Sequence, residues 1–129
     1  MSKPTLNHPL AQVRGLGSAH DGTHHFWLQR LTALALVPLT IWFVASVVCK
    51  LTASHEEFVL WMKSIPVATA MVIFLIATLW HAALGLQVVL EDYVHTHMLR
   101  TLSIILVKFA CFTLAVMGVL AVLKISLGA

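Results

Sequence analysis

The feature that most constrains this chain is a run, residues 64–90, that contains no lysine, arginine, aspartate or glutamate. Two further runs are similar: residues 31–49 carry no formal charge, and residues 101–123 are interrupted only by Lys108. A helix needs about 20 apolar residues to cross the hydrocarbon of a bilayer. Three such runs predict three membrane-spanning helices, of which the longest is expected to tilt or to extend beyond the bilayer.

The composition supports the membrane class. Of the 129 residues, 60% are hydrophobic and only 10% are charged, whereas about 25% of the residues of a soluble domain are charged. The eight lysines and arginines are scattered, and without a basic stripe no nucleic-acid partner is expected. We therefore expect an all-α membrane protein, with a polar N-terminal tail over residues 1–29 and a three-helix transmembrane anchor domain over residues 30–129.

Local signals refine these elements. The connections between the runs are short, which favours an up-down-up arrangement of the three helices. Pro38 lies inside the first run and is expected to bend it. Ser54 followed three residues later by Glu57 is the pattern of a capping box, which predicts a short helix in the first connection. Pro66 suits the first turn of the second span.

His81 is the only histidine within the three runs. An ionisable side chain at membrane depth is costly and is a functional-site hypothesis by default. A neutral imidazole can be an axial ligand of haem iron, and the small neighbours Ala82, Ala83 and Gly85 would let a flat group approach. The alternatives are a hydrogen bond across a helix interface and a proton relay. If the haem has two histidine ligands, the second must come from another chain, so the helical bundle would be heteromeric.

Asp92 and Tyr93 follow His81 by eleven and twelve positions, where the second run ends. On a continuous helix Asp92 shares a face with His81, and Tyr93 lies about 120° around. A phenol near the membrane surface can donate a hydrogen bond to a quinone carbonyl, and a neighbouring carboxylate can orient it or relay protons. The alternative is an ordinary interfacial tyrosine beside a solvated aspartate.

Other polar residues lie near the expected membrane edges. Arg30 and His24 precede the first span and could pair with haem propionates, although Arg30 could equally be a snorkelling anchor. Lys108 in the third run is expected to snorkel, and a propionate or a polar cavity is the alternative. His95 and His97 are spaced like metal ligands, but no third ligand is evident, which favours a solvated loop.

These residues together resemble a known family. His81 with Asp92-Tyr93, between a long helix and a third one, resembles the smaller, hydrophobic membrane-anchor chain of bacterial succinate dehydrogenase. Two overlapping segments before the first span fit the same family, the second its alphaproteobacterial branch: Gly22-x-His24-x-Phe26-x-x-x-Arg30 and His25-Phe26-Trp27-x-Gln29-Arg30-Leu31-Thr32-Ala33. The resemblance covers roughly residues 17–125.

The resemblance implies site residues and cofactors. His81 would be an axial ligand of a single haem b, with the other ligand from the second membrane-anchor subunit of the complex. Tyr93, with Asp92 beside it, would line the ubiquinone site near the iron–sulfur subunit. His24 and Arg30 would lie near the haem propionates, and His25 could substitute for His24. The resemblance assigns no role to Lys108.

The resemblance also implies partners and location. The partners would be the second anchor subunit, the iron–sulfur subunit and the flavoprotein subunit, in the bacterial inner membrane with a cytoplasmic N-terminus. The positive-inside rule leans the same way, with four lysines and arginines on the N-terminal side against three on the other: Lys3, Arg14, Arg30 and Arg100 against Lys50, Lys63 and Lys124.

The implied function is anchoring of succinate dehydrogenase, respiratory complex II, which passes electrons from succinate to ubiquinone in the tricarboxylic acid cycle. The chain itself carries no flavin-binding fingerprint and no cysteine cluster for iron–sulfur centres, so succinate oxidation would belong to the other subunits. Two alternatives remain open. One is the anchor of a fumarate reductase or another quinone-linked enzyme, and the other is a small proton- or metal-handling membrane protein.

Overall fold

The computed structural model describes residues 17–128, with the side chains of all of these except residues 17–23 and 25. This part of the chain is helical and has no strand. It folds into four helices, α2 (Gly17–Lys50), α3 (His55–Met62), α4 (Ile65–Tyr93) and α5 (His97–Leu127). Three of these, all but α3, are long and apolar enough to cross a membrane. The predicted all-α membrane fold is confirmed.

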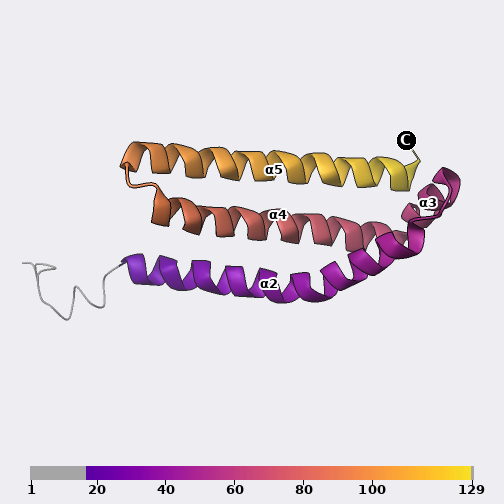
Figure 1. Ribbon diagram of the computed structural model, residues 1–129, viewed down its shortest axis with the longest axis horizontal. Helices are drawn as coiled ribbons and strands as arrows, with labels where there is room; N and C mark the ends of the chain where they lie inside the picture. Colours follow the sequence, from indigo (N-terminus) through magenta and orange to yellow (C-terminus); the bar gives the residue numbers. More distant parts are fainter. Residues whose placement is uncertain (1–16, 129) are drawn as a thin grey trace, which may run out of the picture.

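Helix α2 begins earlier than the first charge-free run. Residues 17–29, assigned from the sequence to a polar tail, form the first turns of the same helix that continues to Lys50. The apolar part suited to a membrane starts at Phe26. A helix extends into polar sequence because its backbone hydrogen bonds do not depend on apolar side chains. Figure 1 shows a bend in the second half of α2, the half that contains Pro38.

The short helix α3 begins with the predicted capping box. The Ser54 hydroxyl accepts a bond of 3.3 Å from the Glu57 backbone N–H. The Glu57 carboxylate accepts one of 2.9 Å from the Ser54 backbone N–H. Two otherwise unpaired donors at the start of the helix are thus satisfied. The chain then reverses at Lys63 and Ser64, and Pro66 lies in the first turn of α4, where its missing N–H costs no helix bond.

The three long helices form a layer with α4 in the middle, as Figure 1 shows. Residues 94–96 join α4 to α5, and so short a connection requires antiparallel neighbours. The start of α2, the end of α4 and the start of α5 therefore lie at one end of the layer, and α3 covers the other end (Figure 1). The predicted up-down-up order places the segment before the first span and the Asp92 loop on the same side.

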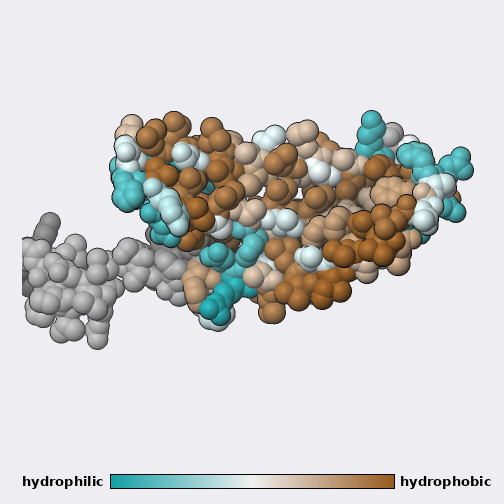
Figure 2. Space-filling view, in the orientation of Figure 1, coloured by the Kyte–Doolittle hydropathy of each residue, from teal (hydrophilic) through white to brown (hydrophobic). Residues whose placement is uncertain are grey.

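The described chain has a very small core of its own. Its buried hydrophobic residues are Met62, Ala68, Leu84 and Val122, and three of them form one cluster where α3 meets α4 and α5. In the first and third spans no residue of the most apolar window is buried, and Figure 2 shows hydrophobic side chains over most of the visible face of the layer. Large exposed apolar surfaces mark contacts with lipid or with other proteins.

Candidate functional site

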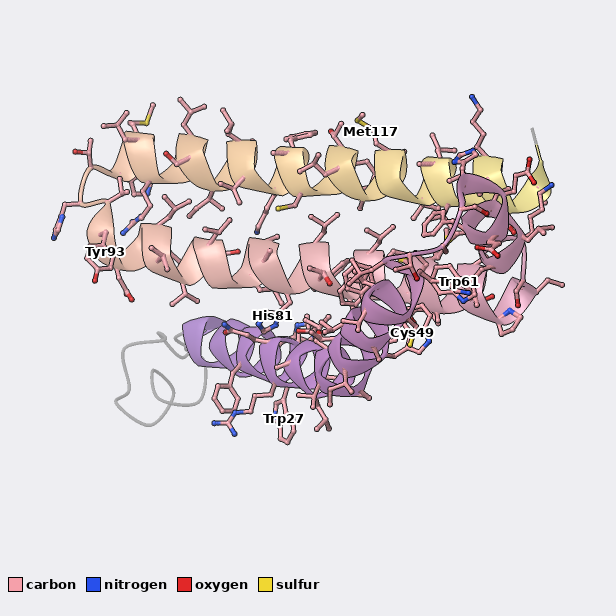
Figure 3. All side chains as sticks on the ribbon, turned by 45° about the vertical axis from the view of Figure 1, so that its right-hand side comes forward. Trp27, Cys49, Trp61, His81, Tyr93 and Met117 are labelled. Carbon is pink, nitrogen blue, oxygen red and sulfur yellow. The ribbon has the colours of Figure 1, made fainter. Side chains whose placement is uncertain are left out.

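His81 lies within α4, about 18 Å along the helix from Tyr93. Its side chain is partly buried and lies toward α2 (Figure 3). There Nδ1 of the imidazole is 2.9 Å from the hydroxyl oxygen of Thr32. This bond joins the two helices across positions 49 residues apart in the chain. The sequence alternative of a hydrogen bond across a helix interface therefore holds for Nδ1.

The other imidazole nitrogen, Nε2, forms no hydrogen bond within the described residues. Nearby, Gly85 lies about 40° around α4 from His81, and a Cβ built on Gly85 would meet no atom within 4 Å. An unpaired nitrogen beside open space fits a flat group such as haem, which takes its axial ligands from neutral imidazole. Among residues 17–128 no group of three or more His, Cys, Asp or Glu could hold a metal ion, so an iron atom at His81 needs its remaining ligands from elsewhere.

Asp92 and Tyr93 form the end of α4, and Val94 caps the helix with a bond from its N–H to the Leu90 carbonyl. Both residues are exposed, Tyr93 by 79%. Figure 3 shows Tyr93 at the end of the layer opposite to α3. One unbroken helix thus carries His81 and this pair, so the helical rise assumed from the sequence holds: the two positions lie at different depths along one axis.

Arg30 and Thr32 lie on different sides of α2. Two residues on a helix differ by about 200°, so Arg30 lies nearly opposite the face that meets His81. Its guanidinium carbon lies 4.6 Å from the centroid of the Phe26 ring, a cation–π contact. His24 is exposed and lies about two turns toward the start of the helix. The side chain of His25 is outside the described residues, so the choice between His24 and His25 stays open.

Thr32 was not among the site residues predicted from the sequence. It belongs to the segment that resembles the alphaproteobacterial branch, but threonine is common in apolar helices and only the pairing of α2 with α4 brings it to His81. A polar side chain two residues after Arg30, on the face of α2 turned away from that arginine, was the available signal.

Lys108 lies at a groove between α4 and α5 of about 680 Å³, whose lining is otherwise largely apolar. The side chain is exposed, as a snorkelling lysine requires. Leu84 and Cys111 also line this groove. His95 and His97, in and after the loop between these helices, are exposed.

The fold defines a class: a multi-pass helical membrane subunit, nearly coreless by itself, with one polar side chain paired deep between two spans. The family model of the succinate dehydrogenase/fumarate reductase transmembrane subunit matches residues 4–115. The chain belongs to this family. The resemblance to succinate dehydrogenase anchor subunits, stated from short motifs, is confirmed over most of the chain.

Relatives with the same printed name support the anchoring role. The succinate dehydrogenase hydrophobic membrane anchor subunit of Rickettsia conorii is 33% identical over 113 residues, 87% of this chain and 90% of the relative. That of Rickettsia bellii is 34% identical over 88% of this chain and 90% of its own length. The subunit of Paracoccus denitrificans is 30% identical over 94% and 93%. No solved structure matches the chain significantly.

Proposed function

We propose that this membrane anchor supplies one axial ligand of a haem b and one wall of a ubiquinone-reduction site in succinate dehydrogenase. The observation that carries the proposal is the placement of two polar sites on one helix. His81 is paired inside the layer through Nδ1 only, and Asp92 and Tyr93 lie exposed at the helix end. A buried ligand and a surface phenol on the same helix suit electron transfer to a substrate that arrives from the lipid.

The haem part of the proposal assigns three residues. Haem b would supply a one-electron redox centre, and Nε2 of His81 is the nitrogen available to bind its iron. The second ligand would come from the second anchor subunit, because the described residues offer no second histidine beside His81. The exposed side chains of Arg30 and His24 lie between the depth of His81 and the polar end of the layer. There a cation would neutralise the haem propionates.

The quinone part assigns Tyr93 and Asp92. Reduction of ubiquinone to ubiquinol takes two electrons and two protons, so the site needs access to water. The Tyr93 phenol is positioned at the membrane edge, where it can donate a hydrogen bond to a quinone carbonyl. Asp92 is adjacent and exposed, as a carboxylate that exchanges protons with solvent must be.

The wider assembly follows from the same placement. The iron–sulfur subunit would lie against the end of the layer that carries Tyr93, with the flavoprotein subunit beyond it. Four lysines and arginines lie toward that end of the chain path against three toward the other. The positive-inside rule then favours a cytoplasmic N-terminus in the bacterial inner membrane. The exposed faces of α2, α4 and α5 provide surface for the second anchor subunit and for lipid.

A fumarate reductase anchor is the second candidate, because the family model covers both enzymes. The relatives named above are all called succinate dehydrogenase subunits, which favours succinate oxidation. A small proton- or metal-handling protein is disfavoured by the family membership.

The test is a reduced-minus-oxidised absorption spectrum of the purified complex. We expect a b-type haem signal in the wild type and its loss, or conversion to a high-spin spectrum, in a His81→Gln complex. A His95→Gln complex is the matched control, because His95 is an exposed loop histidine, and it should keep the wild-type spectrum. A wild-type complex without a b-type signal would overturn the haem proposal.

A further inference from the structure

We propose that Thr32 is a positioning residue for His81: its hydroxyl accepts a hydrogen bond from Nδ1–H and so holds the imidazole with its lone pair on Nε2. The inference rests on the proposed haem role of His81 and adds a specific residue on another helix to it. The Thr32 oxygen lies 2.9 Å from Nδ1, a distance typical of a hydrogen bond. The question is which of the two atoms donates.

The hydroxyl of Thr32 has one hydrogen and two lone pairs. On its own helix the oxygen lies 2.9 Å from the carbonyl of Leu28 and 3.0 Å from that of Gln29. Both of these atoms can only accept, so the single hydroxyl hydrogen has its partner within α2. The remaining lone pairs of the oxygen are then available to His81, and Nδ1 must be the atom that carries the hydrogen.

This assignment has a chemical consequence. In a neutral imidazole one nitrogen is protonated and the other has the lone pair. With the hydrogen on Nδ1, the lone pair is on Nε2, the nitrogen without a partner among the described residues. Histidines that bind metals commonly donate their other N–H to a protein acceptor, which fixes the tautomer and the ring orientation and raises the basicity of the ligand. Thr32 is in the position to do this for His81.

The acceptor is itself held rigidly. Threonine is branched at Cβ, and its χ1 angle is restricted in a helix, so the bond to the preceding turn leaves the hydroxyl little freedom. The two helices are also joined farther along the same interface, where the Phe43 ring stacks on that of Phe74 at 4.7 Å. The ring plane of His81 would therefore be set by α2, not by α4 alone.

The test compares three variants of the complete purified complex. Thr32→Val keeps the side-chain shape and removes the hydroxyl, and Thr32→Ser keeps the hydroxyl. Thr101→Val is the matched control, because the Thr101 hydroxyl also bonds the carbonyl four residues earlier, His97, at 2.9 Å, without a histidine ring as partner. The measurements are haem content, the midpoint potential of the haem, and the ferric low-spin electron paramagnetic resonance spectrum, which responds to the orientation of the axial rings.

Loss of the bond makes the ligand less basic and stabilises ferric iron less. We expect Thr32→Val to bind haem with a midpoint potential more positive than that of the wild type and with shifted g values, and Thr32→Ser and Thr101→Val to match the wild type. If Thr32→Val loses haem altogether, retention of haem in Thr32→Ser supports the hydroxyl as the cause.

Two results overturn the inference and leave the haem role of His81 intact. One is a haem-containing Thr32→Val complex with wild-type potential and spectrum. The other is loss of haem in Thr32→Ser as well as in Thr32→Val, which would assign the effect to packing. By contrast, a wild-type complex without haem, or a His81→Gln complex with an unchanged haem spectrum, would overturn the proposed function itself.

Discussion

The rings of Phe43 on α2 and Phe74 on α4 stack with their centroids 4.7 Å apart and their planes inclined by 20°. Phe74 lies two turns from His81, and Phe43 three turns from Thr32, each within about 20° of the same helix face. The aromatic pair and the Thr32–His81 bond therefore fix the interface between α2 and α4 at two levels. An interface held at two levels has one register, and that register determines which side chain meets His81.

The stacked pair should be energetically coupled. We expect a double-mutant cycle of Phe43→Leu and Phe74→Leu to give a coupling energy of about 1 kcal/mol, because aromatic pairs contribute roughly 0.5–1.5 kcal/mol beyond the area that they bury. The measurement is thermal unfolding of the detergent-solubilised complex. Phe109→Leu is the control, because that ring on α5 is 68% exposed in this chain. Additive effects of the two substitutions would contradict the coupling.

The capping box of α3 should set the local stability of that helix. Ser54→Ala removes an N-cap, a loss of about 1 kcal/mol, which corresponds to roughly fivefold faster hydrogen exchange in the first turn. The measurement is hydrogen–deuterium exchange of α3 peptides in the assembled complex. Thr52→Ala is the control, because Thr52 is exposed and precedes the cap. Unchanged exchange in Ser54→Ala would show that neighbouring contacts hold α3 without the box.

Several of these elements could be predicted from local sequence because their causes are local. A run without charges reports membrane depth, and Ser54 with Glu57 satisfies backbone donors three residues away. The start of α2 at Gly17 could not be found in this way, because the polar residues there show no apolar run. Thr32 was missed for another reason: its role depends on the register between α2 and α4, which is set by packing between distant segments.

Tyr93 should be required for quinone chemistry and not for succinate oxidation. We expect Tyr93→Phe to lower succinate:quinone reductase activity by about tenfold to a hundredfold, because one hydrogen bond to a carbonyl that gains charge is lost. Dye-linked succinate oxidation, which bypasses the quinone site, should stay unchanged. His95→Gln serves as a control for a change in the adjacent loop. Wild-type quinone turnover in Tyr93→Phe would count against the assignment of Tyr93.

The open space beside Gly85 leads to a prediction about size. A Cβ at Gly85 meets nothing within this chain, and replacement of glycine by alanine in a helix gains about 1 kcal/mol of helix propensity. The chain alone would therefore tolerate larger residues here. If haem occupies this space, haem content per complex should fall from Gly85→Ala to Gly85→Leu, although α4 itself becomes more stable. The measurement is haem content by pyridine haemochrome assay against protein.

A glycine on the neighbouring helix provides the comparison. At Gly118 a Cβ would lie 3.2 Å from the Cδ1 atom of Leu75, so Gly118→Ala should shift the packing of α5 against α4 by a few tenths of an ångström at that methyl group. Gly118 lies on α5, away from the α2–α4 interface that holds His81, so its haem content should match the wild type. Loss of haem in Gly85→Leu alone places the cofactor beside α4. Full haem content in Gly85→Leu would mean that the haem lies on another side of His81.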